Sequence, residues 1–243
     1  MSNSLPISSA IPDDQPVRGG SFWTYFTWCL PVSLLACAWL ISAYDIPIAR
    51  FFQSGIVPGF LREVVENTEP FGHGIGVVIL MGTCAIVHRE RSRTYVYAGA
   101  IALGAGLCTN VLKFAIGRSR PRDLDLASYN LTETFSGWFP YLNGITTSQS
   151  FPSGHTTVAW ALAAIFCHLH PHARMYFIGL AMFVGYGRVQ CSAHFPSDVF
   201  VGAALGWTVA TIAARKLPNV FETQIQKQKS DSVTNTLPQA QTA

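Results

Sequence analysis

Long apolar segments alternate with short polar ones along most of this chain. Residues 21–44 carry no charged side chain, and residues 94–112 form a second uncharged run. As a helix, the first run is long enough to cross the roughly 30 Å hydrocarbon core of a bilayer, and the second nearly so. The pattern predicts six membrane-spanning helices, at residues 22–43, 71–87, 94–116, 155–169, 175–189 and 198–214.

The last three predicted spans are shorter and carry polar residues at one end. Polar groups at membrane depth are tolerated where they face other helices or water rather than lipid. We therefore expect an all-α fold, an integral membrane bundle of six transmembrane helices formed by residues 21–217. Residues 1–20 and 218–243 are rich in Ser, Thr, Gln, Asn and Pro, so we expect disordered tails there.

The composition agrees with a lipid environment. The chain is 49% hydrophobic and 12% charged, with a mean hydropathy of +0.29, whereas soluble domains carry about 25% charged residues. The net charge of +3 comes without a basic stripe interleaved with aromatics, so we expect no nucleic-acid partner. The six cysteines stand singly, which favours small buried hydrophobic residues over a zinc site or a disulfide framework.

Basic residues in three short loops predict the orientation. If six spans alternate, the loops at 88–93, 170–174 and 215–216 fall on one side, which the positive-inside tendency makes cytoplasmic. The basic residues between 113 and 122 oppose this bias, and binding an anion would be a reason for them. A segment at 47–66 has apolar residues at near-helical spacing, and it either lies on the bilayer surface or packs on the bundle.

Three polar stretches carry candidate chemistry at the predicted extracytoplasmic ends of these spans. In the first, Lys113 ends a span, and Arg120 follows after six residues, directly before Pro121. Arginine offers a planar fork that grips two phosphate oxygens, and lysine adds a movable point charge. The alternative is snorkelling, in which cations at a helix end reach toward the lipid headgroups.

The second stretch is a helix start that suits an anion. Ser153 is a good N-cap residue, and Gly154 lets a ligand approach the backbone. The unpaired N–H groups and partial positive charge of a helix N-terminus favour phosphate, and His155 follows in the first turn. An ordinary capped helix with a chance histidine is the alternative.

The third stretch places Arg188 ahead of His194 and Asp198, which are four residues apart, with Pro196 at the first position of a helix. An aspartate at this spacing can accept a hydrogen bond from one imidazole nitrogen and leave the other free to attack. A structural His–Asp contact is the alternative. An ionisable pair at the end of a membrane helix, with an arginine nearby, makes a functional role as well supported as the structural contact.

Taken in order, these stretches resemble the signature of the type 2 phosphatidate phosphatase family, which also includes bacterial acid phosphatases, glucose-6-phosphatase and vanadium haloperoxidases. The motifs extend over residues 113–198. The resemblance implies that His194 is the nucleophile and forms a phosphohistidine, with Asp198 orienting it. It also implies that His155 protonates the leaving oxygen and then helps a water molecule attack the phosphoenzyme.

The resemblance further implies that a cradle of cations and backbone groups holds the phosphate, with no metal and no cofactor. Its members are Lys113, Arg120, Ser153, Gly154 and Arg188. One departure is that Gly187 precedes Arg188 where the family usually has serine, which removes one hydrogen bond worth about 1 kcal/mol. Two further arginines flank the first motif and are expected to help with a substrate that carries more than one phosphate: Arg118 and Arg122.

The expected substrate is the phosphate monoester or diphosphate of a membrane lipid, such as phosphatidate, phosphatidylglycerophosphate, a polyprenyl diphosphate or lipid A. One alternative is a membrane-bound phosphatase of a soluble ester. A non-catalytic transporter is disfavoured, because the charges lie at span ends and no internal repeat is found. A haloperoxidase would gain nothing obvious from the bilayer. We expect a bacterial inner membrane protein whose site faces the periplasm or the outside, with a eukaryotic internal membrane as the alternative.

Overall fold

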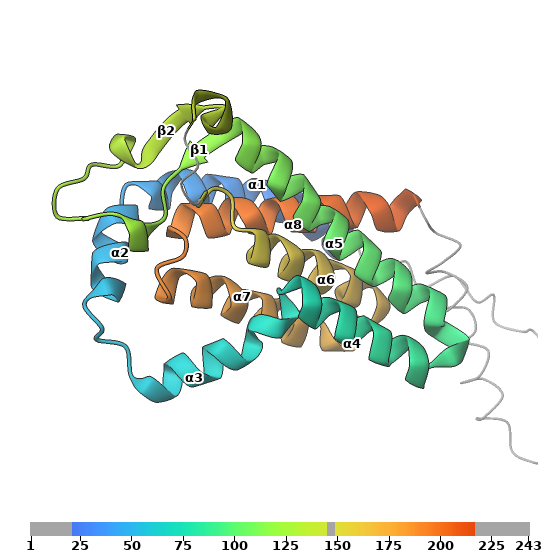
Figure 1. Ribbon diagram of the computed structural model, residues 1–243. Coiled ribbons are helices and arrows are strands. Elements are labelled where there is room, and N and C mark those ends of the chain that lie inside the picture. The colour runs from blue at the N-terminus through green and yellow to red at the C-terminus, as the bar shows by residue number, and fades with distance from the viewer. Residues whose placement is uncertain (1–20, 145–148, 217–243) are drawn as a thin grey trace, which may run out of the picture.

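The computed structural model describes residues 21–144 and 149–216, and Figure 1 shows a helical bundle with a small sheet at one end. The α-helices are α1 (Ser21–Ser42), α2 (Asp45–Gln53), α3 (Gly59–Thr68), α4 (Gly74–Val87), α5 (Ser92–Ala115), α6 (Gly154–Leu169), α7 (Arg174–Gln190) and α8 (Pro196–Lys216). Short 3₁₀ helices and strands are η1 (Glu69–Phe71), η2 (Arg89–Arg91), η3 (Pro121–Asp123), η4 (Thr132–Thr134), η5 (Pro140–Asn143), η6 (Pro171–Ala173), β1 (Ile116–Arg118) and β2 (Phe135–Trp138). The predicted tails lie outside the described residues.

Helices occupy all six ranges in which spans were predicted, but they differ in length. Among the described residues, three helical stretches are long and apolar enough to cross a membrane: Tyr25–Ser42, Arg89–Ala115 and Pro196–Lys216. Gly59–Phe71 and Gly74–Val87, bent by 65°, would together form a fourth, broken span. The fold is therefore mostly helical with three or four candidate membrane spans, and the count of six stays a prediction.

Helix α6 lies at the centre of the bundle. Every residue from Thr156 to Ala163 is buried, and α5, α7 and α8 pack around it. In α8, Gly206 comes so close that an added Cβ would stand 2.0 Å from the Thr157 carbonyl oxygen. Small residues allow this close approach of helices in membranes. Enclosure by protein is what allows α6 to be short and to begin with polar residues.

The outer faces of α1, α4 and α5 present large apolar side chains to the surroundings, as Trp39 and Ile79 do. The same exposure corrects the expectation that the cysteines are buried. Cys29, Cys37 and Cys108 are exposed on α1 and α5, and Cys191 is exposed after α7, whereas Cys167 is buried. An apolar residue on a membrane helix can face lipid as readily as protein, so hydrophobic surroundings in the sequence did not predict burial.

A two-stranded antiparallel sheet departs from the predicted all-α fold. Ile116 pairs with Trp138, and Gly117 pairs with Gly137. Strand β1 begins directly after the last residue of α5. Strands of three and four residues are too short to show an alternating pattern in the sequence. The sheet matters because β1 carries Arg118 into the protein interior and directs the chain toward Arg120.

The predicted segment at 47–66 forms α2 and α3, which contact α7 rather than only the bilayer. Val65 of α3 is buried. A Cβ at Gly187 of α7 would lie 2.5 Å from Val65 Cγ1. The close crossing of α3 over α7 therefore explains why glycine stands where the family usually has serine.

The two ends of the bundle differ in chemistry. Figure 1 shows the α4–α5 junction and the last turn of α8 at one end, and the strands with α2 at the other. The first end carries the basic loops at 88–93 and 215–216. The second end gathers the residues of all three motifs.

Candidate active site

Five elements deliver the predicted site residues to the same end of the bundle. Lys113 is in the last turn of α5, Arg188 in the last turn of α7, and His155 in the first turn of α6. Arg120 precedes η3, and His194 lies in the turn between α7 and α8. Helix termini thus supply most of the site, which is where backbone groups and partial charges are available to a ligand.

His194 is buried in a tightly bonded turn. Its exposed fraction is 4%, and its N–H and that of Ala193 both donate to the Arg188 carbonyl at 3.1 Å. Nδ1 of His194 lies 3.4 Å from Ser150 Oγ and 3.9 Å from Asp198 Oδ2. The direct His–Asp hydrogen bond that we expected is therefore not made.

Ser150 stands between the two residues instead. Its hydroxyl donates to Asp198 Oδ2 at 2.5 Å while facing His194 Nδ1. The hydroxyl therefore links the carboxylate to the imidazole, and hydrogen bonds at active sites are often long before substrate binds. Because Nδ1 faces Ser150, Nε2 is the ring nitrogen left for another partner.

Asp198 is fully buried and is fixed by the start of α8. Phe195 N–H donates to Asp198 Oδ2 at 2.9 Å, and Asp198 N–H donates back to the Phe195 carbonyl at 3.1 Å. The bond to the carboxylate is one half of a capping box, in which a side chain three positions further on reaches back to an N–H at the helix start. The local sequence thus sets the carboxylate before any tertiary contact does.

Burial lowers the pKa of His194 well below its usual value, and the charges of Lys113 and Arg120 lower it further. Both causes disfavour the imidazolium form. His194 is therefore neutral at neutral pH, as a nucleophile must be.

This shift predicts the acid limb of the pH profile. Activity requires neutral His194, so kcat/KM should hold as the pH falls through about 6.5, the ordinary histidine value, and decline only lower, at the depressed pKa. Measuring kcat/KM between about pH 4 and pH 9 tests this, since this ratio reports the free enzyme. An acid limb at or above the ordinary histidine value would contradict it.

Glu69 of η1 links two of the predicted site residues. Its Oε1 lies 3.0 Å from Arg188 Nη1 and 3.3 Å from His155 Nε2. No local pattern in the sequence marks this residue, because it lies 119 positions from Arg188. The carboxylate fixes Arg188 and lies beside the imidazole of His155.

Two buried guanidinium donors at the site, Nε of Arg120 and Nε of Arg188, have no acceptor within the described part of the chain. Nε2 of His155 makes no hydrogen bond there either, and its neighbour is the Glu69 carboxylate. Buried polar groups are nearly always hydrogen-bonded, so donors converging without acceptors indicate a place for an anion. Lys113 approaches the same region, where its Nζ donates to the Gln149 carbonyl at 2.6 Å.

The start of α6 forms one wall of this candidate anion-binding site. Ser153 is its N-cap residue but makes no side-chain capping bond, because its buried hydroxyl accepts from Thr156 at 2.9 Å. The Ser153 N–H donates to the Asp198 carbonyl at 3.1 Å. By helix geometry, the amides of Gly154 and His155 have no intrahelical acceptor and are available to phosphate oxygens.

Arg118 does not take the role that the sequence suggested. It is 1% exposed, with Nη2 2.7 Å from Asp45 Oδ2 and Nη1 bonded to Asp198. Nη1 also donates to Ser197 Oγ at 2.9 Å, and the hydroxyl and N–H of Ser197 donate to Asp45. A second phosphate cannot reach this guanidinium, which supports Asp198 from behind. Asp45 had one sequence signal, a carboxylate directly after an uncharged span.

No group of three or more His, Cys, Asp or Glu side chains is arranged to hold a metal ion within residues 21–144 and 149–216. The donors that converge at the site are cations and amides, which suit an anion.

Comparisons with known proteins agree with this geometry. The PAP2 superfamily profile matches residues 94–222. A "Lipid A 1-phosphatase" of Rhizobium etli is 40% identical over 203 residues, which cover 76% of this chain and 82% of the relative. A "Decaprenylphosphoryl-5-phosphoribose phosphatase" of Mycobacterium tuberculosis is 33% identical over 178 residues, covering 69% and 88%.

Two solved structures share the fold. A PAP2 type phosphatidylglycerolphosphate phosphatase from Bacillus subtilis aligns with a TM-score of 0.52 and 21% identity, over 78% of this chain and 94% of that one. LpxE of Aquifex aeolicus aligns with a TM-score of 0.50 and 23% identity, over 71% and 96%. The resemblance found in the three motifs is thereby confirmed. The protein is a membrane phosphatase acting on lipid phosphates, and the chain belongs to the PAP2 superfamily.

Proposed function

We propose that this protein removes phosphate from a lipid headgroup through a phosphohistidine on His194, without a metal ion. The observation that carries the proposal is the presence of buried guanidinium donors without acceptors, from Arg120 and Arg188, beside a buried neutral histidine. Cations fixed at a dry site stabilise the charge that spreads over the phosphoryl oxygens in the transition state. Positioning and electrostatics are what phosphoryl transfer chiefly requires.

In the first step, Nε2 of His194 attacks phosphorus while the bond from phosphorus to the lipid oxygen breaks. Protonated His155 gives its proton to that oxygen, so a neutral lipid alcohol leaves. Lys113, Arg120, Arg188 and the first amides of α6 hold the transferred phosphoryl group. Asp198, acting through Ser150, stabilises the positive charge that His194 gains.

In the second step, water replaces the histidine. His155, now neutral, accepts a proton from the water as its oxygen attacks phosphorus. The bond from phosphorus to nitrogen breaks, inorganic phosphate forms, and His194 returns to its neutral state. Glu69 keeps His155 in place for both proton transfers.

For the lipid itself we propose the 1-phosphate of a lipid A type glycolipid. This is supported by the 40% identity over most of its length to the Rhizobium etli protein of that name. We further propose six membrane passes with the site on the extracytoplasmic side of a bacterial inner membrane, flanked by the tails at 1–20 and 218–243. The separation of the basic loops from the site along the bundle supports this orientation.

A substrate panel tests the proposed function. The detergent-purified protein is given lipid A phosphate, phosphatidate, phosphatidylglycerophosphate and soluble sugar phosphates, each with and without EDTA, and phosphate release is measured. We expect release from lipid phosphates, highest for lipid A, and no inhibition by EDTA. Release from soluble esters alone would contradict the lipid assignment, and a strict requirement for Mg²⁺ would contradict the cation cradle.

A further inference from the structure

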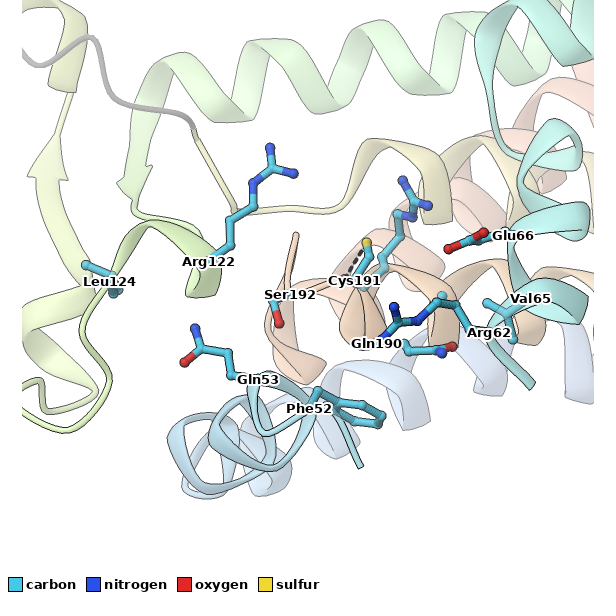
Figure 2. Close-up of a pocket in the computed structure, with 13 residues that line it drawn as sticks. Phe52, Gln53, Arg62, Val65, Glu66, Arg122, Leu124, Gln190, Cys191 and Ser192 are labelled. Carbon is cyan, nitrogen blue, oxygen red and sulfur yellow. Dashed lines mark hydrogen bonds between the residues drawn. The ribbon is translucent and has the colours of Figure 1, made fainter. Parts of the chain in front are cut away.

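A cavity of about 660 Å³ opens beside the phosphate-binding groups, and Figure 2 shows the residues that line it. Its walls come from α2, α3, η3, the last turn of α7 and the turn that follows, and we call it the α3–α7 cavity. It shares Arg188 with the phosphate site. Small-molecule sites usually measure about 300–1,000 Å³, so the cavity has room for much more than one phosphate group.

The α3–α7 cavity is positively charged beyond Arg188. Arg62 of α3 and Arg122 of η3 both line it, and Glu66 is the one carboxylate among its lining residues. Arg62 forms no ion pair with any residue that the structure describes. Arg122 Nε lies 3.8 Å from the exposed carboxylate of Asp123, a kind of surface pair that contributes little. Both guanidinium groups are therefore available to an anion.

Gln190 adds a second, independent indication of a ligand. It is the last residue of α7, it is 8% exposed, and it lines the cavity. Neither its amide nitrogen nor its amide oxygen has a hydrogen-bond partner in the described part of the chain. Leaving a buried amide unpaired is costly, so native structures rarely do it. A primary amide both donates and accepts, which matches a hydroxyl or amide group of a ligand.

The walls of the cavity are held in place by bonds between its elements. Gln53 Nε2 of α2 donates to the Pro121 carbonyl of η3 at 2.8 Å, and Arg122 N–H donates to the Ser192 carbonyl at 3.0 Å. Figure 2 shows Arg122 on one side of the view and Arg62 with Gln190 on the other, with Cys191 and Ser192 between them. A site fixed before binding loses less conformational freedom when the ligand arrives.

We propose that the α3–α7 cavity binds the part of the lipid headgroup beyond the scissile phosphate. Arg62 and Arg122 hold a second anionic group of the same lipid, and Gln190 holds a hydroxyl or amide group between the two. The proposal rests on the proposed function, because it takes the scissile phosphate to lie against Arg188. It makes these three residues determinants of headgroup specificity.

Anionic groups can also come from neighbouring lipids or from released phosphate, and these sources share the chemistry of the proposed ligand. The structure favours the substrate itself, because Arg188 is common to the cavity and the phosphate site. In neutral detergent micelles with one lipid substrate, neighbouring anionic lipids are absent. Added inorganic phosphate then shows whether a free anion occupies the cavity.

The test compares matched substrates. One pair is lipid A 1,4′-bisphosphate and the same lipid without the 4′-phosphate, and the other is phosphatidylglycerophosphate and phosphatidate. For the wild type we expect KM to be lower for the member with the second phosphate, by about tenfold, the discrimination expected of one charge-assisted contact. Arg62→Gln and Arg122→Gln should each reduce this KM ratio toward one in both pairs. Gln190→Leu should reduce it in the second pair, where only phosphatidylglycerophosphate carries the extra glycerol hydroxyl. Arg89→Gln, an exposed arginine in η2 at the opposite end of the bundle, is the matched control and should keep both ratio and activity.

Thiol protection gives a readout that does not depend on turnover. Cys191 lines the cavity and is exposed, and Cys29 on α1 is an exposed reference thiol away from it. In His194→Ala protein, the bisphosphate lipid should slow maleimide labelling of Cys191 by about tenfold relative to its monophosphate partner, the same affinity difference. Labelling of Cys29 should not distinguish the two lipids. Peptide mass spectrometry measures both sites.

The possible outcomes separate the two proposals. The cavity is supported as a headgroup site if the variants reduce the KM ratio toward one in either substrate pair and the lipid protects Cys191. If the wild type hydrolyses lipid phosphates with equal KM within both pairs, or the variants lower activity on all substrates alike, the headgroup site is wrong and the proposed function stands. If lipid A is not hydrolysed but the second pair shows the ratio, the lipid A assignment fails and the cavity proposal survives. Equal Cys191 protection by inorganic phosphate alone would also overturn the headgroup site.

Discussion

Replacing His194 with alanine is expected to reduce phosphate release by about 10⁴-fold or more, because loss of a nucleophile leaves only the catalysis that binding and charge stabilisation provide. His194 is the one deeply buried imidazole at this end of the described chain, and its N–H donates to the Arg188 carbonyl. The measurement is the initial rate of phosphate release from a lipid phosphate in detergent. His88→Ala, a half-exposed histidine at the opposite end of the bundle, is the matched control and should keep full activity.

The same variant also tests the covalent intermediate. Wild-type protein mixed briefly with radiolabelled substrate and denatured in alkali should retain label that acid removes, as a phosphoramidate bond does. His194→Ala should retain none, while its thermal unfolding in detergent should stay close to that of the wild type. Residual activity of a few per cent in a folded His194→Ala protein would remove this residue from the role of nucleophile.

Replacing Arg118 with methionine is expected to lower the free energy of unfolding by about 3–5 kcal/mol, the usual cost of removing one partner from a buried ion pair. The guanidinium lies between Asp45 and Asp198, which are both fully buried. Burial already raises the pKa of Asp45, and Arg118 opposes that rise. Without the arginine, one carboxylate must be protonated or reach water, and Asp198 loses the contact that holds it behind Ser150.

Unfolding in mixed micelles of increasing SDS content measures this effect, and activity measured on the folded fraction should fall as well. Arg93→Met, an exposed arginine at the opposite end of the bundle, is the matched control. The double variant Arg118→Met/Asp45→Asn should recover part of the lost stability, because it removes one of the two unpaired charges. If Arg118→Met and Arg93→Met unfold at the same SDS content, the buried network does not stabilise the protein.

The sequence predicted those parts of the site that depend on residues close together in the chain. Uncharged runs predicted the helices. Neighbouring residues also determine the helix starts at Asp198 and at α6. The motif residues therefore arrive together once the helices pack. What the sequence did not predict depends on contacts between distant segments, such as Asp45 with Arg118, 73 positions apart. Glu69 and Ser150 were not predicted as site residues for the same reason, because their partners are distant in the chain.

Gly187 shows how a departure from a motif can have a cause outside the motif. The sequence suggested a lost hydrogen bond to phosphate. The structure shows that α3 crosses at this point and leaves no room for a side chain, since Val65 would contact any Cβ. The same crossing brings Arg62 to the cavity beside Arg188. The crossing of α3 over α7 therefore has two effects. It removes one contact to phosphate, and it supplies a wall of the cavity.

The contact between Arg118 and Asp45 also limits how far the catalytic unit can be separated from the rest of the chain. The matched family region begins at residue 94 and holds all three motifs, yet Asp45 lies well before it. A bundle that inherited the three motifs alone would leave Arg118 with one buried carboxylate where this protein has two. The motifs are therefore not a portable module. Transplanting this chemistry to another helical scaffold would require carrying over the acidic residue that follows the first helix.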